Sequence, residues 1–466
     1  MVYALFFIML LFLAFLWVWI RSRTTWKKHG SSNEIVVAFF HPNALSGGGG
    51  ERVLWVMIDA LQRRDRARKD DKKIRYVIYH SAPVPNSFIE ASEKIHSQFN
   101  IQLQRPVEFV PVVKSHLIDE KRYRRLTMIM QSIGSIRLAW ECLTRLCPDY
   151  YIDTTGFAFC YPLARIAGCK IMTYTHYPAV STDMLSFVRS GTAAHNNSGI
   201  IARSVLLTGI KVFYYRIFSY AYCLCGKCTH LVMVNSSWTS SHIMSIWARQ
   251  DVHIVFPPAP VEDLMKLPLN SRQNNIVSVA QFRPEKRHDF QIHIFAEVLK
   301  TCRQAGIKEE PKLIFVGGCR NEADQQRVMD LKKLTRQLGV ENQVTFELNA
   351  SYEKLKAYLG SSKIGLHAMW NEHFGISVVE YMAAGCIAVA HRSGGPAMDI
   401  IIPAHDGPIG FLADSMETYV AALCAILLGD LSKKDLEKIQ IRGREQCQIF
   451  SDKSFAEKVQ ELMVFE

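Results

Sequence analysis

One stretch in the second half of the chain, residues 364–395, limits the possible folds more than any other. It reads IGLHAMWNEHFGISVVEYMAAGCIAVAHRSGG. An apolar run at 364–369 precedes a polar break, a segment of helical spacing at 376–384, a glycine and a second apolar run at 386–390. This order predicts a parallel β-α-β unit, which binds its ligand where the strands end and the helix begins.

The same alternation of short apolar runs and helical segments fills most of the chain. Strands are expected at 34–40, 73–80, 106–113, 150–154, 170–175, 231–234, 276–281, 312–316 and 343–346. Helices are expected at 53–61, 88–100, 126–147, 238–247, 289–304, 323–338, 352–359, 416–428 and 435–450. A chain of 466 residues is too long for one ordinary domain. The break at Pro257-Pro258 is the best boundary, and the second half predicts a doubly wound parallel sheet.

The amino terminus carries an apolar segment, residues 2–20, without a single charge. Nineteen residues are about the length that crosses a bilayer once. Basic residues follow the segment and none precedes it, which favours an anchor with a cytosolic body over a cleaved signal peptide. The segment 203–227 is also apolar and aromatic, and either a core helix or a helix lying on a membrane fits it.

Composition narrows the function classes. The formal net charge of +12 favours phosphate-rich partners, but no dense Arg/Lys block with interleaved aromatics occurs, so nucleic acid is not expected. The twelve cysteines are scattered and mostly lie in apolar runs, which favours a reducing compartment. Cys223, Cys225 and Cys228 cluster without a matching Cys/His pair, so a structural metal stays only an alternative.

Two carboxylates mark the 364–395 stretch, Glu372 before its helix and Glu380 within it. Two glutamates eight positions apart are common on a solvated helix face, so the spacing alone is weak. A basic segment after the first strand of the second half adds Arg283 and Lys286, which solvated loop charges would equally explain. Cations at a strand end can neutralise a leaving diphosphate, and no Asp-x-Asp motif for a divalent ion stands out.

The first half contributes a run of four glycines, residues 47–50, between its first strand and first helix. Glycines at this place let backbone amides approach a phosphate or sugar closely, although a flexible surface loop would look alike. His176 falls at the carboxyl end of another strand. A lone histidine is usually structural, and its position is what favours a functional role.

These elements together resemble the retaining GT-B glycosyltransferases, which use nucleoside diphosphate sugars and carry an E-x7-E element like Glu372–Glu380. The resemblance implies two doubly wound α/β Rossmann-like domains facing across a cleft, with an N-terminal transmembrane helix. The expected division is 1–21 for the anchor, 33–256 for the acceptor-side domain, 257–430 for the nucleotide-sugar domain and 431–466 for helices packing back on the first domain.

The resemblance also implies roles for residues. Glu372 would contact the transferred sugar and stabilise positive charge at its anomeric carbon, and His176 would touch the sugar and the acceptor. Glu380 would accept hydrogen bonds from the ribose hydroxyls. The expected catalytic pair is Glu372 and His176, and the expected donor-binding set is Gly48, Gly49, Gly50, Arg283, Lys286, Phe374, Gly375, Ile376 and Glu380. The chain departs from the pattern at Gln281, where relatives carry an arginine, so Arg283 would substitute or Lys286 would act with less help.

Four blocks narrow the resemblance: FFHPNALSGGGGERVLW, YTHYPAVSTDML, SVAQFRPEKRH and NEHFGISVVEYMAAG. In combination they are similar to the GDP-mannose-dependent α-1,2-mannosyltransferases of asparagine-linked glycosylation. That branch extends the dolichol-diphosphate-linked oligosaccharide on the cytosolic face of the endoplasmic reticulum membrane, adding the fourth and fifth mannoses without a metal or other cofactor. Other mannosyltransferases of the pathway are further expected partners. The alternatives are a related membrane-bound retaining GT-B glycosyltransferase that uses another nucleotide sugar or acceptor, and a membrane scaffold without catalytic activity.

Overall fold

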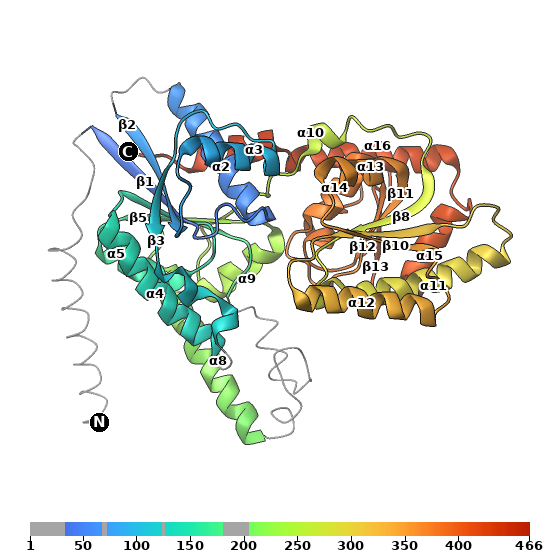
Figure 1. Ribbon diagram of the computed structural model, residues 1–466, viewed down its shortest axis with the longest axis horizontal. Coiled ribbons are helices and arrows are strands. Elements are labelled where there is room, and N and C mark those ends of the chain that lie inside the picture. Colours follow the sequence, from blue (N-terminus) through green and yellow to red (C-terminus); the bar gives the residue numbers. More distant parts are fainter. Residues whose placement is uncertain (1–32, 68–71, 124–125, 180–204) are drawn as a thin grey trace. The chain divides into compact units, whose positions relative to one another are not determined.

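The computed structural model describes residues 33–67, 72–123, 126–179 and 205–466. These residues form two compact units, each built on its own parallel sheet (Figure 1). The first unit contains the chain up to Asn235, Thr239–Val255 and Ala456–Glu466. The second contains Ser236–Trp238 and Phe256–Phe455.

The sheet of the first unit has seven parallel strands in the order β3-β2-β1-β4-β5-β6-β7. The strands are β1(Glu34–Phe40), β2(Lys73–Ser81), β3(Glu108–Val112), β4(Tyr150–Asp153), β5(Lys170–Thr175), β6(Leu231–Val234) and β7(Val252–Ile254). Its helices are α2(Gly49–Arg66), α3(Phe88–Phe99), α4(Thr127–Arg145), α5(Tyr161–Ile166), α8(Val205–Gly226) and most of α9(Ser237–Trp247). The central strand β1 is buried on both faces, as a near-continuous apolar run in a parallel sheet requires.

The sheet of the second unit has six parallel strands in the order β10-β9-β8-β11-β12-β13. The strands are β8(Gln273–Val279), β9(Lys312–Gly317), β10(Val344–Leu348), β11(Ser362–His367), β12(Ile387–His391) and β13(Phe411–Ala413). Its helices are α10(Val261–Leu264), α11(His288–Gln304), α12(Glu322–Gln337), α13(Tyr352–Ser361), α14(Ile376–Ala384), α15(Met416–Leu427) and α16(Lys433–Cys447).

Each sheet reverses its strand order once. In the first, the chain runs from β1 outward through β2 and β3 and then returns to β4 on the other side of β1. In the second, it runs from β8 through β9 and β10 and returns to β11. A reversal of this kind leaves a crevice at the carboxyl ends of the two neighbouring strands, where doubly wound proteins bind ligands.

The carboxyl-terminal region differs from the expected block at 431–466. Helix α16 belongs to the second unit, where the guanidinium of Arg444 donates to the carbonyl of Ala383 at the end of α14. Only Ala456–Glu466, with most of α17(Asp452–Leu462), groups with the first unit. The reason is packing, because α16 buries Ile439 and Cys447 against apolar residues of the second unit.

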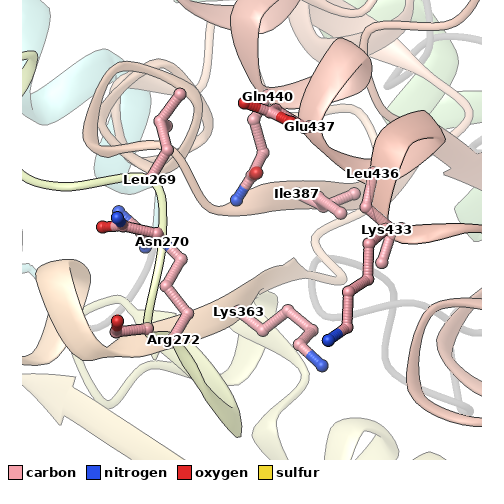
Figure 2. A pocket seen from close by; sticks show the side chains of 10 residues that line it. Leu269, Asn270, Arg272, Lys363, Ile387, Lys433, Leu436, Glu437 and Gln440 are labelled. Carbon is pink, nitrogen blue, oxygen red and sulfur yellow. The ribbon is translucent and has the colours of Figure 1, made fainter.

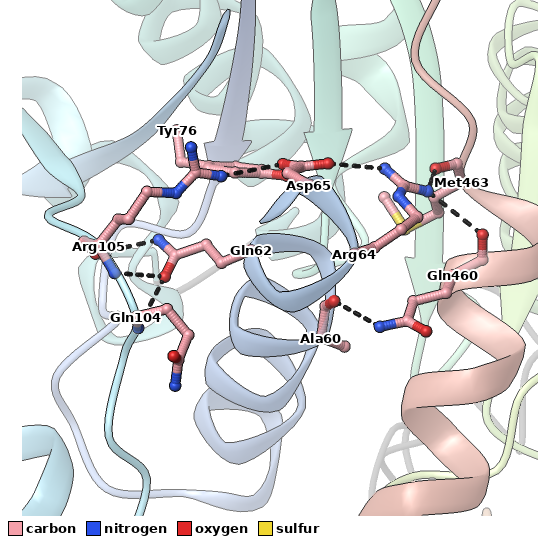
Figure 3. A network of polar contacts seen from close by, with 9 residues as sticks. All are labelled: Ala60, Gln62, Arg64, Asp65, Tyr76, Gln104, Arg105, Gln460 and Met463. Atoms are coloured by element: carbon pink, nitrogen blue, oxygen red, sulfur yellow. Dashed lines mark hydrogen bonds and ion pairs between the residues drawn. The ribbon is translucent and has the colours of Figure 1, made fainter. Parts of the chain in front are cut away.

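The returning tail is fixed to α2 by polar contacts (Figure 3). Arg64 donates to the carbonyls of Gln460 and Met463, and the Gln460 side chain donates to the carbonyl of Ala60 at 2.6 Å. Phe465 is fully buried beside the ring of Tyr150. The last residues of the chain therefore complete the core of the first unit.

Two further expectations from the sequence concern a membrane anchor and a metal site. The predicted anchor at residues 2–20 lies outside the described residues. Among the residues that are described, none of the helices combines the length and apolar character needed to span a bilayer. The cysteine cluster near 223–228 forms no centre, since no group of three or more His, Cys, Asp or Glu in the described chain could hold a metal ion.

Candidate active site

The reversal point of the second sheet brings together a lysine, a glutamate and a histidine. Lys286 lies on a short 3-10 turn just after β8, and Glu372 lies on the loop after β11. The ammonium of Lys286 donates to Oε2 of Glu372, forming an ion pair. His367, the last residue of β11, places Nε2 3.1 Å from the same oxygen. Lys286 and Glu372, both predicted site residues, therefore meet in space although they stand 86 positions apart in the sequence.

The charge of Glu372 is held in a nearly closed environment, with 12% of its side chain exposed. Burial alone would raise the pKa of this carboxyl, but the contacts from His367 and Lys286 outweigh it and hold the pKa well below its usual range. Glu372 is therefore an anion throughout the physiological pH range. In an ion pair of this kind, the carboxylate can face positive charge on a sugar, and the ammonium can face negative charge on a diphosphate.

The loop that carries Glu372 is clamped by a neighbouring loop after β12. The Ser393 hydroxyl accepts from the Asn371 amide at 2.8 Å, and the Gly395 amide donates to the Glu372 carbonyl at 2.8 Å. Gly394 has φ +59°, and a Cβ at this position would stand 2.2 Å from the Glu372 carbonyl oxygen. Only glycine allows the two loops to approach this closely.

The helix after Glu372 begins at Gly375, whose φ of +105° is a conformation that other residues rarely adopt. Ile376 and Glu380 lie in α14, with Glu380 partly exposed on the helix. Phe374 differs from its expected place in the donor-binding set, because its ring is buried against Phe256 and Phe450. Its side chain is part of the core, and only its backbone borders the Glu372 loop.

Arg283 does not lie with Lys286 and Glu372. Its exposed side chain lines a separate cavity of about 430 Å³, together with Arg327 and Asp330 of α12. The structure thus brings Lys286 to Glu372 and turns the neighbouring arginine toward another helix.

The reversal point of the first sheet holds a second cluster of polar residues. His41 follows β1 and Thr154 follows β4, and the His41 Nδ1 lies 2.7 Å from the Thr154 hydroxyl. The other ring nitrogen of His41 lies 3.6 Å from Glu51, in the first turn of α2. Glu51 in turn accepts a hydrogen bond from the Gly48 amide at 2.7 Å. Glu51 therefore fixes the glycine run between the strand and the helix.

Burial would raise the pKa of Glu51, but interactions with His41 and with the Gly48 amide lower it below its usual range. The glycine run itself differs from the expected loop, because Gly49 and Gly50 form the first turn of α2 and Gly48 is its N-cap. Glu51 already takes the Gly48 amide, so the amides of Gly49 and Gly50 are the ones left to meet a phosphate or sugar, and that contact stays a prediction.

His176 follows β5, as expected, and lies next to the glycine run. A Cβ added to Gly50 would stand 3.5 Å from Nε2 of His176. The ring of His176 also contacts that of the buried Tyr174. The structure therefore brings two of the predicted features of the first unit, the glycines and His176, to one place.

A further cavity of about 630 Å³ lies at the opposite edge of the second sheet (Figure 2). It is lined by Arg272 before β8, Lys363 near the start of β11 and Lys433 at the start of α16. Figure 2 shows the side-chain ends of Lys363 and Lys433 near each other. The cavity borders the amino ends of the strands, away from Lys286 and Glu372, and has no part in the candidate site.

Comparison with known proteins gives one consistent result. A family model described as "ALG11 mannosyltransferase N-terminus" matches residues 34–247, and one described as "Glycosyl transferases group 1" matches residues 262–446. A protein of Mus musculus named GDP-Man:Man(3)GlcNAc(2)-PP-Dol alpha-1,2-mannosyltransferase is 43% identical over 442 residues, covering 93% of this chain and 87% of the relative. The chain belongs to this mannosyltransferase family. A Caenorhabditis elegans member is 38% identical, covering 86% of this chain and 85% of its own length.

Solved structures that resemble the chain support the fold of the family. An α,α-trehalose-phosphate synthase from Burkholderia xenovorans matches with a TM-score of 0.63 at 12% identity, covering 92% of this chain and 99% of its own. A sucrose-phosphate synthase from Thermosynechococcus elongatus matches with a TM-score of 0.60 at 15% identity, covering 92% and 98%. The predicted GT-B-like arrangement of two parallel sheets is therefore confirmed.

Sequence reasoning missed three residues of the two clusters: His41, Glu51 and His367. The first two stand in the quoted glycine block and could have been found, since a strand-ending histidine and a first-turn glutamate flank the glycines. His367 gave no signal, because its contact with Glu372 depends on where β11 ends.

Proposed function

We propose that the chain transfers mannose from GDP-mannose, in α-1,2 linkage, to the Man3GlcNAc2 oligosaccharide of dolichol diphosphate. The observation that carries this proposal is the 43% identity to mannosyltransferases named for that acceptor, over most of both chains. The Lys286–Glu372 ion pair at a sheet reversal point supports it independently. The products would be the oligosaccharides with the fourth and fifth mannoses.

The contacts of the second unit suggest how its residues act. When the bond between the anomeric carbon and the diphosphate oxygen breaks, negative charge grows on the diphosphate, and the Lys286 ammonium is placed to neutralise it. Glu372, an anion fixed by two donors, would stabilise the positive charge on the sugar. In the first unit, the amides of Gly49 and Gly50 and the ring of His176 would contact the phosphates, the sugar and the acceptor.

Transfer with retention can proceed through a covalent intermediate or by attack of the acceptor hydroxyl on the face from which the diphosphate is leaving, and we propose the second route. In this scheme the acceptor oxygen bonds to the anomeric carbon, the diphosphate takes the bonding electron pair, and the hydroxyl proton passes to a diphosphate oxygen. Lys286 and backbone amides would supply the positive charge for this step, so we propose that no divalent ion takes part. Activity should persist in excess chelator, and loss on chelation with recovery on adding manganese would contradict the proposal.

The donor and the catalytic carboxylate are tested by one transfer assay. Membranes containing the full chain are given labelled GDP-mannose and the lipid-linked Man3GlcNAc2 acceptor, with GDP or UDP as competitor. We expect label in the lipid fraction, inhibition by GDP and not by UDP, and a loss of about 100-fold or more for Glu372→Ala. Glu353→Ala, which removes an exposed carboxylate of α13 in the same unit, is the matched control and should match wild type.

Absence of label in the lipid fraction would contradict the proposed reaction. Inhibition by UDP in place of GDP would point to another nucleotide sugar. Full activity of Glu372→Ala would leave the reaction in place and remove the role given to this carboxylate.

We further propose that the chain works at the cytosolic face of the endoplasmic reticulum membrane. The acceptor of its relatives is named as a dolichol-linked oligosaccharide, and a polyprenyl chain resides in a bilayer. Helix α8 offers a fitting surface, because its outer face exposes a stripe of apolar side chains whose exposure lies between 48% and 67%. These are Phe213, Ile217, Tyr220 and Leu224, which fall within roughly 60° around the helix axis at about 100° per residue.

The other side of α8 is apolar as well, with Tyr215 and Phe218 packed against Met128 and Ile129 around α4. The exposed Arg216 lies beside the outer stripe, so α8 presents apolar and aromatic side chains next to a basic one. Aromatic residues favour the membrane interface, and a basic residue beside them suits anionic headgroups. The buried inner face agrees with the first of the two interpretations of segment 203–227, a core-facing helix, since Tyr222 and Cys225 belong to the core of the first unit. The outer stripe supports the second interpretation, which stays a proposal.

A fluorescence experiment tests this surface in the folded, full-length chain. The chain has eight tryptophans of its own, including Trp17 and Trp19 in the predicted anchor, so quenching by brominated lipid is measured as the change from wild type in the same vesicles. By that measure, Tyr220→Trp should add a quenched component. Met329→Trp, at an equally exposed apolar position on α12, is the control and should not be quenched. Equal quenching at both positions, or at neither, would contradict docking through α8.

A further inference from the structure

His367 is more deeply buried than either of its charged neighbours, with 4% of its side chain exposed against 12% for Glu372 and 22% for Lys286. It ends β11, its residue is 3% exposed, and its carbonyl accepts a hydrogen bond from the buried Tyr419 hydroxyl at 3.0 Å. The ring therefore has little freedom to turn. Its Nε2 lies 3.1 Å from Oε2 of Glu372.

The contacts of the two ring nitrogens of His367 are different. A carboxylate oxygen only accepts hydrogen bonds at neutral pH, so Nε2 carries the proton and donates it to Glu372. The other ring nitrogen, Nδ1, is buried and has no hydrogen-bond partner among the described residues. The contact with Glu372 is thus the single polar contact of the ring within that part of the chain.

Lys286 and His367 share one acceptor atom but differ in what else they can do. Both approach Oε2 of Glu372. The lysine is attached through a flexible four-carbon stem, its side chain is 22% exposed, and it lies where a diphosphate would bring more negative charge than one carboxylate. The histidine ends a strand, and Glu372 is the polar partner of its ring among the described residues.

We propose that His367 is a positioning residue, which holds the Glu372 carboxylate in place when Lys286 leaves it for the diphosphate of the donor. Without His367, the carboxylate would lose its remaining fixed donor at the moment when the sugar needs it. This inference rests on the proposed function, which gives Glu372 to the sugar and Lys286 to the diphosphate.

The first experiment compares His367→Leu with His367→Gln in the full-length chain. A misplaced catalytic group costs turnover more than binding, so His367→Leu should lower kcat about 10- to 100-fold and leave the KM for GDP-mannose within about threefold. The glutamine amide can donate to the same oxygen, so His367→Gln should recover at least a third of the wild-type kcat. An unchanged kcat in His367→Leu, or equal losses in both variants with equal falls in Tm, would overturn the proposal.

The second experiment asks whether His367 acts through Glu372. In a Glu372→Gln background, adding His367→Leu should lower the residual kcat by less than about twofold, because residues that act as a unit are not additive. A further 10-fold loss would mean that His367 acts on its own and would overturn the proposal. If residual activity is too low to follow, the comparison of leucine and glutamine decides.

The proposed role of Glu372 and the positioning role of His367 would be refuted by different results. Wild-type activity in Glu372→Gln would remove the proposed role of Glu372 whatever His367 does. A strongly impaired Glu372→Gln together with a fully active His367→Leu would leave the proposed function standing and would refute the positioning role alone.

Discussion

The closest approach of two loops at the candidate site gives the sharpest prediction. Gly394 has φ +59°, and a Cβ at this position would stand 2.2 Å from the Glu372 carbonyl oxygen and 3.0 Å from the Asn371 carbonyl carbon. These neighbours are backbone atoms, which cannot turn aside as a flexible side chain can. Gly394→Ala must therefore displace the loop that carries Glu372.

The loss of folding stability in Gly394→Ala has two parts, backbone strain and overpacking, and comparison with a second glycine separates them. A positive φ costs an alanine about 1 kcal/mol or slightly more, and overpacking costs roughly 1–3 kcal/mol. Gly429, after α15, also has a positive φ of +90°, but no heavy atom lies within 4 Å of an added Cβ. Gly429→Ala therefore carries the backbone cost alone. The difference between the two variants, about 2 kcal/mol, corresponds to a difference in Tm of about 6 °C in a unit of some 200 residues.

Thermal unfolding and mannosyl transfer of the full-length chain measure the two consequences. We expect the Tm of Gly394→Ala to lie about 6 °C below that of Gly429→Ala, and its kcat to fall about 10- to 100-fold, because a shift of about 1 Å at a catalytic group can cost 100-fold. Gly429→Ala should keep kcat within about twofold of wild type. Equal Tm values and equal activity in the two variants would refute the argument that these loops depend on a missing Cβ.

Three further predictions concern other parts of the chain. Glu51→Ala removes the acceptor of the Gly48 amide and should lower kcat/KM about 10-fold in steady-state assays. An unchanged kcat/KM would show that activity does not depend on this hydrogen bond. Phe465→Ala empties a fully buried site beside Tyr150 and should destabilise the first unit by about 3 kcal/mol, seen as faster hydrogen exchange in β1 and not in β8. Folding lowers the pKa of the Glu372 carboxyl. The stability that this carboxylate contributes is therefore present above its ordinary pKa of 4.5 and is lost only as the pH falls below that value. The difference in Tm between wild type and Glu372→Gln should accordingly stay constant from pH 8 to pH 5. A difference that shrinks already near pH 6 would show that the carboxyl is not held by these donors.

The sequence predicted those parts of the fold that depend on local signals. Helix α14 has its expected bounds because glycines with positive φ stand at both ends, Gly375 at +105° and Gly385 at +89°. Strand β1 also agrees, since a strand of seven residues with six of them buried can hardly shift its register. In contrast, the helix after the glycine run begins four residues earlier than expected, at Gly49, because Glu51 accepts from the Gly48 amide and so caps a helix that starts with glycines.

Other features depend on residues distant in the sequence and could not be predicted from local patterns. Phe374 stands next to the Glu372 loop in the sequence, but rings more than 70 residues away on either side bury it. Arg283 stands three positions from Lys286, and the short turn between them sends its side chain toward α12. Which neighbour a loop residue meets is decided by the ends of the strands, and pattern and propensity place those ends only approximately.

The two polar clusters are built in the same way, which accounts for their charges. In each sheet a histidine ends or follows a central strand beside the reversal point, His41 after β1 and His367 in β11. In each, a glutamate at or just before the start of the next helix faces that histidine, Glu51 in α2 and Glu372 before α14. Removing a carboxylate from water is costly unless donors surround it, and the carboxyl edge of a parallel sheet supplies both a rigid ring and helix amides. Both glutamates therefore keep a lowered pKa despite burial, so each unit holds an anion that orders its loop. Among the described residues, a lysine pairs with that anion in the second unit, Lys286 with Glu372, whereas Glu51 pairs with a histidine. This difference supports the proposal that the charge-separating step belongs to the second unit.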